Sequence, residues 1–323
     1  MLKEPNHMKK AFKIIGKVFL GLLILIVLFV VIMTIYNQIM LKKNKDLYET
    51  PLGQLVDIDG HNMSIYTEGK GEHTIVFMSG WDTVSPILDF KPLYSRLSDD
   101  YRCVVIEKFG YGFSDIVDGE RDFDTILRQD REALKKAGIE APYVLCPHSL
   151  SGFEATLWAQ KYPDEVEAIV GLDMSTANYP ELAEMKDSFP QKAAICINKA
   201  LRATGVLRLM DFDISGTLSE QEKKIYTEIA CHKDTNENIV SENENIGAVI
   251  LEINSAALPE TPTLQFLSGD NKNDELWYST HKEYADASTS GEIVQLECGH
   301  YVHDFEYERI SKDIKEFIEK DNG

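Results

Sequence analysis

The sequence is poor in cysteine and, beyond position 45, poor in basic residues. Its five cysteines form no Cys-x-x-Cys pair and no His/Cys group with zinc-site spacing, so we expect neither a metal site nor a disulfide framework. Of 33 Lys and Arg and 53 Asp and Glu, residues 1–45 hold eight lysines and one acid, which leaves 25 basic against 52 acidic residues. Because so acidic a body repels phosphate backbones, nucleic-acid binding is excluded.

The N-terminal part contains a long uncharged hydrophobic run, residues 18–36. About 20 residues at a rise of 1.5 Å each cross the hydrocarbon core of a bilayer, so the run predicts one transmembrane helix. A cleaved signal peptide would have a shorter run and a small-x-small cleavage site, which the sequence lacks. Five lysines precede the run and three follow it. The positive-inside rule therefore favours a cytoplasmic segment 1–17 and, after a linker over 37–50, an extracytoplasmic body over 51–323.

The body alternates short apolar runs with helical patterns, which is typical of an α/β fold with a mostly parallel sheet. Asp59-Gly60 is a tight-turn dipeptide, so we expect the body to open with a hairpin. The predicted strands cover residues 54–58, 63–68, 74–79, 102–108, 143–147, 167–173, 263–268 and 292–297. Apolar residues spaced three and four apart predict helices over residues 86–97, 124–137, 150–161 and 307–318.

The interval from about 176 to 260 breaks this alternation and shows no internal repeat. It contains amphipathic stretches at residues 192–210, 220–231 and 245–257. An insertion of this kind between two strands predicts a helical cap. The Asn- and Glu-rich run 236–245 is expected to be a solvated connection within the cap.

Ser149 lies between a predicted strand and a predicted helix, in the segment VLCPHSLSGFEA. A sharp turn at such a junction can project a hydroxyl above the sheet edge, toward which the helix directs its N-terminus. The segment resembles the nucleophile elbow of the α/β-hydrolase family, with Pro147 and Ser151 in the two positions where glycine is usual. The alternative is that Ser149 only caps the helix.

The resemblance continues, in chain order, over roughly residues 53–320. Ser79-Gly80-Trp81 occupies the place of the family's His-Gly motif, which implies an oxyanion hole formed by the backbone N–H groups of Trp81 and Leu150. The alternative for Trp81 is a packing role. The segment 109–115, FGYGFSD, is similar to the family's Gly-x-Gly-x-Ser-Asp turn. We assign that turn a structural role, since its glycines permit positive φ and close backbone approach.

A serine hydroxyl needs a neutral imidazole within hydrogen-bond reach to become a good nucleophile. His300 follows the last predicted strand and precedes the last helix, where the family keeps its catalytic histidine, and the order Ser before His agrees. His303 is expected to pack or hydrogen-bond near the site. His148, next to the serine, is expected to point elsewhere.

The acid that orients the imidazole has three candidates. Most relatives carry it after the seventh strand as Gly-x-x-Asp, but three residues after Gly269 the sequence has Lys272, with Asp270 and Asp274 on either side. Other relatives, haloalkane dehalogenases among them, place the acid after the sixth strand, where this sequence has Asp173. We favour Asp173 and keep Asp270 and Asp274 as alternatives.

The resemblance implies an α/β-hydrolase fold: a mostly parallel eight-stranded sheet flanked by helices, with a helical cap. The apolar run 18–36 adds one N-terminal transmembrane helix as membrane anchor. The resemblance further implies a serine hydrolase that cleaves a carboxylic ester or related acyl bond of a small molecule. Ser149 would attack, His300 would transfer the proton and Asp173 would hold the ring, without a cofactor.

A serine nucleophile argues against dehalogenase or epoxide hydrolase activity, because members of this fold with those activities use aspartate there. Two alternatives stay open. One is a proline-type aminopeptidase of the same fold, whose substrate amine an acidic cap would attract. The other is a noncatalytic binding module, which the absence of histidine at position 79 and the empty Gly-x-x-Asp position favour.

Overall fold

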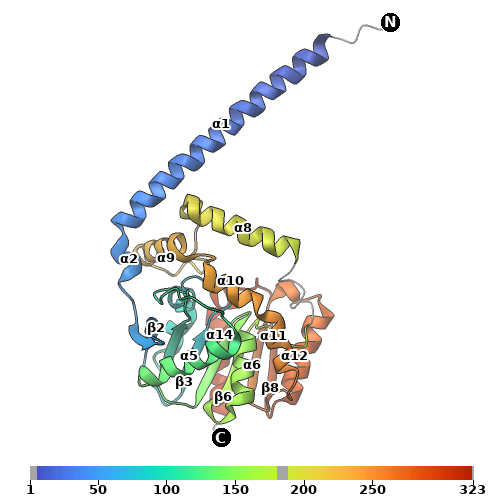
Figure 1. Cartoon of the computed structure of the whole chain (residues 1–323). Coiled ribbons are helices and arrows are strands. Elements are labelled where there is room, and N and C mark those ends of the chain that lie inside the picture. The colour runs from blue at the N-terminus through green and yellow to red at the C-terminus, as the bar shows by residue number, and fades with distance from the viewer. Residues whose placement is uncertain (1–5, 180–187, 322–323) are drawn as a thin grey trace.

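The computed structural model describes residues 6–179 and 188–321. A central eight-stranded sheet carries helices on both faces, and a long helix projects from this body (Figure 1). The strands agree with the predicted segments to within two residues. They are β1 (Gln54–Ile58), β2 (His61–Glu68), β3 (Thr74–Met78), β4 (Arg102–Glu107), β5 (Tyr143–Pro147), β6 (Val166–Leu172), β7 (Thr263–Leu267) and β8 (Gly291–Gln295).

The strand order is β1-β2-β4-β3-β5-β6-β7-β8. Strand β2 runs antiparallel to both β1 and β4, and every later pair is parallel. The predicted hairpin and the predicted mostly parallel eight-stranded sheet are therefore confirmed. Every residue of β3 and β5 is buried, which explains their uninterrupted apolar sequences.

The core consists of two apolar clusters, one on each face of the sheet. One face carries α3 (Pro86–Asp89), α4 (Lys91–Leu97), α13 (Val302–Phe305) and α14 (Tyr307–Asp321). The other carries α5 (Phe123–Lys136), α6 (Ser151–Lys161) and α12 (Glu275–Ala287). Short 3₁₀ turns are η1 (Pro163–Glu165) and η3 (Gly269–Asn271).

Two helical features differ from the sequence-based expectation. The predicted helix over 86–97 is two helices, because Pro92 lies in the first turn of α4 and lacks the N–H that would continue α3. Helix α12 was not among the predicted helices. Its first turn begins at Asp274, whose carboxylate accepts hydrogen bonds from the N–H groups of Leu276 and Trp277.

The inserted cap lies over the edge of the sheet at which β3 and β5 end (Figure 1). Its predicted segment 180–187 lies outside the described residues. The described cap elements are α8 (Phe189–Thr204), η2 (Val206–Leu209), α9 (Glu220–Lys233), α10 (Glu237–Glu244) and α11 (Ile246–Ile253).

The prediction of a solvated connection over 236–245 is wrong, because this run contains helix α10, whose polar side chains are partly buried. The amide of Asn238 exchanges two hydrogen bonds with the backbone of Val117, at 2.8 and 2.6 Å. The carboxylate of Glu242 forms a buried ion pair with Lys108. These partners, more than 100 residues distant in sequence, turn a polar run into a buried helix.

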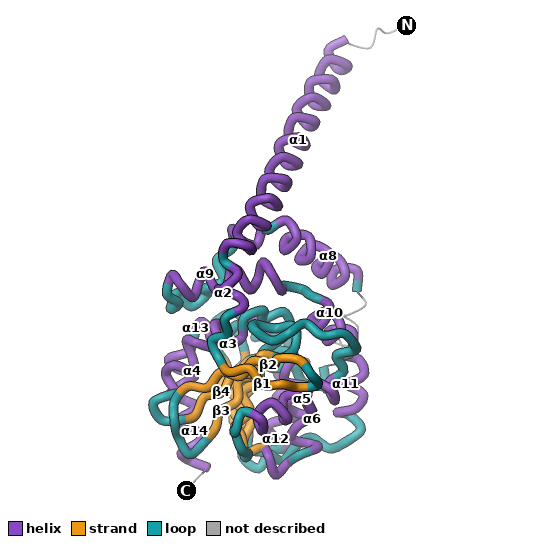
Figure 2. Tube along the Cα trace, turned by 60° about the vertical axis from the view of Figure 1, so that its left-hand side comes forward, coloured by secondary structure: helices purple, strands orange, loops and turns teal. Residues whose placement is uncertain are grey.

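Helix α1 (Asn6–Lys43) contains the apolar run, and its side chains are largely exposed from Phe12 to Ile32. Judged by length and composition, the part of α1 from Phe12 to Lys43 could cross a membrane. The expected linker over 37–50 is instead helical, since α1 continues to Lys43 and α2 (Lys45–Glu49) follows (Figure 2).

The helix continues because it has partners in the cap. Asn37 is only 1% exposed. Its Nδ2 donates to the carbonyl of Arg202 at 3.3 Å, and its Oδ1 accepts from Nε of Arg208 at 2.7 Å. Asn44 donates to Glu228 of α9 at 2.6 Å. The segment 37–44 is therefore part of the folded body.

Candidate active site

Ser149 occupies a strained turn between β5 and α6. Its φ is +53°, in the left-handed region that residues with a side chain rarely adopt. Helix α6 begins at Ser151 with Leu150 as its N-cap residue, and no side chain caps it. The Ser149 hydroxyl is thus not a helix cap, and the strain points to a role for its position.

Small residues let the backbone pass close to this turn. A Cβ on Gly80 would lie 2.8 Å from Cβ of Ser149, so the loop after β3 approaches the serine as only glycine permits. A Cβ on Gly152 would overlap the carbonyl of Ser175. The Ser151 hydroxyl is fully buried and donates to the carbonyl of Met78 at 2.7 Å.

His300 joins Ser149 to Asp173. The Nε2 atom of His300 lies 2.8 Å from Oγ of Ser149, and its Nδ1 lies 2.6 Å from Oδ2 of Asp173. The imidazole is 37% exposed, whereas the carboxylate is fully buried. A serine, an imidazole and a buried carboxylate in this order can activate a hydroxyl and store the proton that it releases.

Asp173 directly follows β6, with a positive φ of 44°. Burial would raise the pKa of its carboxyl, but the hydrogen bond and the charge of His300 and the bonds from Ser268 outweigh burial, so the pKa lies below its ordinary value. One of these bonds is donated by the backbone N–H of Ser268 at 2.9 Å. The carboxyl is therefore held as an anion beside the ring.

The two alternative acids lie elsewhere. Asp270 accepts a hydrogen bond from the backbone N–H of His300 at 3.0 Å, so it supports the loop rather than the ring. Asp274 caps α12 and accepts from the hydroxyl of Tyr179 at 2.7 Å. Of the three candidates, the structure brings Asp173 to the imidazole.

The two amides expected to bind an oxyanion belong to Leu150, which follows the serine in sequence, and Trp81, which follows Gly80 in the loop that approaches the serine. In the described part of the chain neither N–H donates a hydrogen bond. The Trp81 indole donates to the carbonyl of Ile239 in α10 at 2.8 Å, so this residue also packs against the cap. Both expectations for Trp81 are thus compatible with its position.

Asp82 is a site neighbour that sequence reasoning missed. It has a φ of 62° and accepts hydrogen bonds from the N–H and the hydroxyl of Thr235, both at 3.0 Å. Burial, and secondly the charge of Asp234, raise its pKa to about 7. It ties the loop that carries Trp81 to the cap, and no local signal identifies it because its partners lie some 150 residues away.

His148 and His303 lie beside His300. The rings of His148 and His303 meet edge to face with their centroids 4.6 Å apart, and the His148 ring lies 4.7 Å from that of His300. Burial lowers the pKa of His148 well below its ordinary value, with the charges of His303 and His300 contributing, so this imidazole is neutral. Contrary to expectation, His148 points toward the site: its Nε2 lies 3.2 Å from the carbonyl oxygen of His300.

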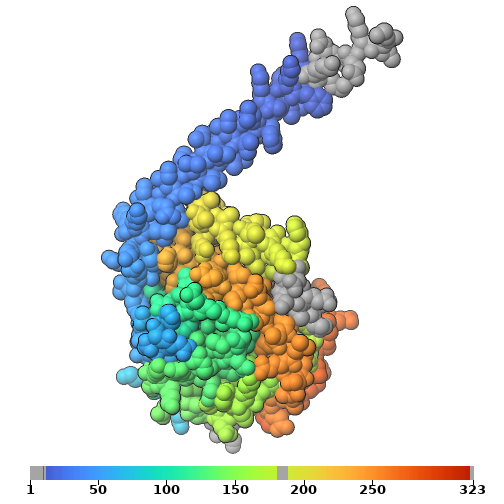
Figure 3. Space-filling model, viewed as in Figure 1, coloured from blue at the N-terminus to red at the C-terminus, as the bar shows by residue number. Residues whose placement is uncertain are grey.

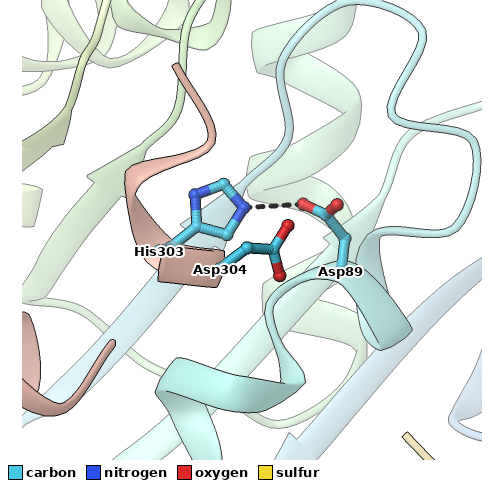
Figure 4. A group of neighbouring side chains, drawn as sticks. All are labelled: Asp89, His303 and Asp304. Carbon is cyan, nitrogen blue, oxygen red and sulfur yellow. Dashed lines mark hydrogen bonds and ion pairs between the residues drawn. The ribbon is translucent and has the colours of Figure 1, made fainter. Parts of the chain in front are cut away.

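His303 packs and hydrogen-bonds near the site, as expected. Its Nε2 lies 2.8 Å from Oδ2 of Asp89, and the carboxylate of Asp304 lies beside the pair (Figure 4). One imidazole and two buried carboxylates are a donor set that a divalent cation accepts. Burial, and secondly Asp89, raise the pKa of Asp304 to about 8. A proton held between the Asp89 and Asp304 carboxylates would balance their charge as a cation would.

Comparison with known proteins gives a relative that matches over nearly its full length. The chain is 32% identical to the Bacillus subtilis protein YbdG, whose function is uncharacterised, over 97% of this chain and 99% of that protein. A pimeloyl-[acyl-carrier protein] methyl ester esterase of Shewanella woodyi is 32% identical over 35% of this chain and 40% of its own length. The chain thus matches less than half of this enzyme. No family model matches.

Solved structures share the fold over most of the chain. The haloalkane dehalogenase DbeA of Bradyrhizobium elkani has a TM-score of 0.61 at 17% identity, covering 83% of this chain and 98% of its own. The enol-lactonase of Burkholderia xenovorans has a TM-score of 0.59 at 16% identity, covering 82% and 99%. The epoxide hydrolase CorEH scores 0.61 at 16% identity, covering 83% and 98%. The chain has the α/β-hydrolase fold and belongs to the family of YbdG.

Proposed function

We propose that this protein is a membrane-anchored serine hydrolase that cleaves a carboxylic ester or related acyl bond of a small molecule. The observation that carries the proposal is the continuous hydrogen-bonded chain from Asp173 through His300 to Ser149, at a serine with φ of +53°. A binding module needs neither the strained serine nor the buried carboxylate behind the imidazole. Strain of this kind is retained where function requires it.

The reaction proceeds through an acyl-enzyme. Oγ of Ser149 attacks the carbonyl carbon while Nε2 of His300 takes the hydroxyl proton, and Asp173 stabilises the imidazolium that forms. The oxyanion of the tetrahedral intermediate is bound by the N–H groups of Trp81 and Leu150. His300 then protonates the leaving alcohol. A water molecule, activated by the same ring, releases the acid and restores Ser149.

The reaction class rests on the nucleophile as well as on the relatives. The esterase of Shewanella woodyi is named for a methyl ester and the Burkholderia xenovorans enzyme for an enol lactone, and both are acyl bonds. The dehalogenase and the epoxide hydrolase share the fold, but members with those activities use aspartate where this chain has Ser149. A serine at this position favours acyl transfer.

The membrane role rests on α1. Its uncharged run 18–36 is exposed along nearly its whole length, and lysines flank it on both sides. Exposed apolar side chains of this number are stable in lipid and costly in water. The excess of lysines before the run favours an N-terminus in the cytoplasm and a hydrolase domain outside.

The test is ester hydrolysis by the full-length chain in detergent micelles. Ser149→Ala should reduce turnover of a p-nitrophenyl ester by at least about 10³-fold, as triad knockouts do, with unchanged far-UV circular dichroism. Ser95→Ala, on the exposed side of α4, is the matched control and should retain full activity. Undiminished turnover by Ser149→Ala would remove this serine from the mechanism. Faster cleavage of proline p-nitroanilide than of any ester would favour the aminopeptidase alternative.

A further inference from the structure

Helix α8 differs in charge from the body that carries it. Its 16 residues include three cations, Lys192, Lys199 and Arg202, and no acid. The body beyond residue 45 has about two acids for every base. No α8 side chain is fully buried, and the helix rests on the body through partly buried side chains such as Leu201. A cationic helix in an anionic protein is suited to an anionic partner.

Large apolar side chains are exposed on and beside this helix. Phe189 is 84% exposed, Ile197 57%, and in the following segment Leu209 is 65% and Met210 52% exposed. We call the α8 surface the group Phe189, Lys192, Ile197, Lys199, Leu209 and Met210. Apolar side chains interspersed with lysines are the composition of helices that lie in the headgroup region of a bilayer.

The α8 surface lies at the level where the apolar run of α1 ends. Asn37, the first residue after that run, is bonded to Arg202 near the end of α8 and to Arg208 in η2. A Cβ on Gly205 would overlap the side chain of Asn37, so the corner between α8 and η2 is in close contact with α1. From this corner α8 runs across the side of the body from which α1 departs (Figures 1 and 3).

We propose that the α8 surface docks on the anionic lipid headgroups of the bilayer that α1 crosses. The inference rests on the proposed anchoring by α1. Lys192 and Lys199 contact lipid phosphates or carboxylates, and Phe189, Ile197, Leu209 and Met210 insert at the headgroup boundary. Because Asn37 bonds to Arg202 and Arg208, the α8 surface keeps a fixed position relative to the end of the apolar run and therefore to the bilayer surface.

Docking connects the bilayer to the candidate active site. Nδ2 of Asn198, in the middle of α8, donates to Oδ2 of Asp82 at 3.4 Å. Asp82 directly follows Trp81, whose N–H is assigned to the oxyanion hole. Helix α8, lying on the lipid surface, thus contacts directly the loop that borders the reaction centre.

A fluorophore on Cys196 reports the position of α8. Cys196 is exposed, between Lys192 and Lys199 in sequence, whereas Cys103, Cys146 and Cys231 are buried. With the half-buried thiol removed by Cys298→Ser, an NBD label goes to Cys196 of the full-length chain in vesicles. The control label goes to Glu140→Cys, in a chain that also carries Cys196→Ser. Residue 140 is exposed and precedes β5, at the edge of the sheet opposite the cap.

Docking predicts a blue shift and strong quenching by nitroxide-headgroup lipids for Cys196, and neither for position 140. Both effects should be larger in vesicles of phosphatidylcholine with phosphatidylserine than in phosphatidylcholine alone. The pair Lys192→Glu and Lys199→Glu should reduce the quenching at Cys196 by at least about half. The pair Lys135→Glu and Lys312→Glu, on exposed positions of α5 and α14, should leave it unchanged.

The outcomes separate this inference from the proposed function. Resistance of the vesicle-bound chain to carbonate extraction reports anchoring by α1, and ester turnover reports catalysis. An unshifted, unquenched Cys196 label in a carbonate-resistant, active chain would overturn docking alone. A chain that carbonate extracts would overturn the anchoring and the docking together. Loss of turnover with an unaltered Cys196 signal would concern only the catalytic proposal.

Discussion

The Nδ1 atom of His300 lies 2.6 Å from Oδ2 of Asp173, a residue 127 positions earlier in the chain. The carboxylate is fully buried and accepts a second hydrogen bond from the backbone of Ser268. The orientation of the Asp173 carboxylate is therefore fixed by Ser268, which follows β7, and by the backbone conformation of Asp173 itself. This geometry holds the imidazole with Nδ1 protonated and leaves Nε2 to accept the proton of Ser149.

Asp173→Asn should lower ester turnover by about 10⁴-fold, because an amide at this position favours the wrong tautomer and leaves the imidazolium without an anion. The matched variants are Asp270→Asn and Asp274→Asn, since these acids bond to backbone groups and not to the ring. Each of these two substitutions should reduce ester turnover far less than Asp173→Asn does. Steady-state kinetics on one p-nitrophenyl ester compares all three. If Asp270→Asn or Asp274→Asn is the crippled variant while Asp173→Asn is nearly normal, the assignment of the acid is wrong.

Gly80→Ala should lower turnover by about 10²-fold with the fold intact, since the new methyl group would lie 2.8 Å from Cβ of Ser149 and displace the hydroxyl. Gly119→Ala is a control for glycine removal away from the site, because a Cβ there meets nothing within 4 Å, although its φ of +106° adds strain. Circular dichroism and kinetics measure both variants. Normal turnover by Gly80→Ala would mean that the loop after β3 adjusts without affecting the serine.

The contacts of α1 with the cap predict where the anchor can be removed. A chain beginning at Met33 keeps Asn37 and Asn44, whereas a chain beginning at Asp46 leaves Arg208 and Glu228 without these partners. Loss of a buried hydrogen-bond partner costs about 1–3 kcal/mol. Differential scanning fluorimetry should therefore give the shorter chain a Tm several degrees lower.

Single substitutions separate this effect from the loss of chain length. In the chain that begins at Met33, Asn37→Ala should reproduce much of the decrease in Tm. Gln38→Ala, at the adjacent exposed position, should not. Equal Tm values for the two truncated chains would show that residues 33–45 do not stabilise the body, as expected for the linker that the sequence predicts.

The Asp304 carboxyl should lower the free energy of unfolding as pH rises. Its pKa is about 8 in the folded chain, raised first by burial and then by Asp89, against an ordinary value of 3.8. The folded state thus retains a proton that the unfolded state loses, so this contribution is full below about pH 4 and is lost as pH rises toward 8. Relative to the unmodified chain, Asp304→Asn should gain Tm from pH 5 to about 8 and level off above it. A constant Tm difference, like that expected for the exposed Asp286→Asn, would contradict the shifted pKa.

The sheet and the serine turn were predictable because their signals are local. Buried parallel strands produce short apolar runs, and the segment around Ser149 combines a strand end, a small-residue turn and a helix start. The acid was not decided by local sequence, since Asp173, Asp270 and Asp274 all follow strands that end at the same edge. Only the fold shows that the side chains of Asp270 and Asp274 are engaged with backbone groups.

The cap and the end of α1 were predicted less well for one physical reason. The run 236–245 is polar, yet Glu242 is buried against Lys108 and Asn238 against Val117. Asn37 similarly ends an apolar run but is buried by Arg208. Polar residues that are buried through distant partners have the same local sequence as exposed ones, so composition assigns them to solvent.

Covalent labelling tests the central claim most directly. A fluorophosphonate probe reacts with a serine only when a base activates it, so the full-length chain should be labelled at Ser149, as peptide mass spectrometry can determine. His300→Ala should abolish the labelling, and Asp173→Asn should slow it strongly, while the adjacent buried Ser151 remains unmodified. A folded chain that the probe leaves unlabelled, or labels at a serine other than Ser149, would contradict the account.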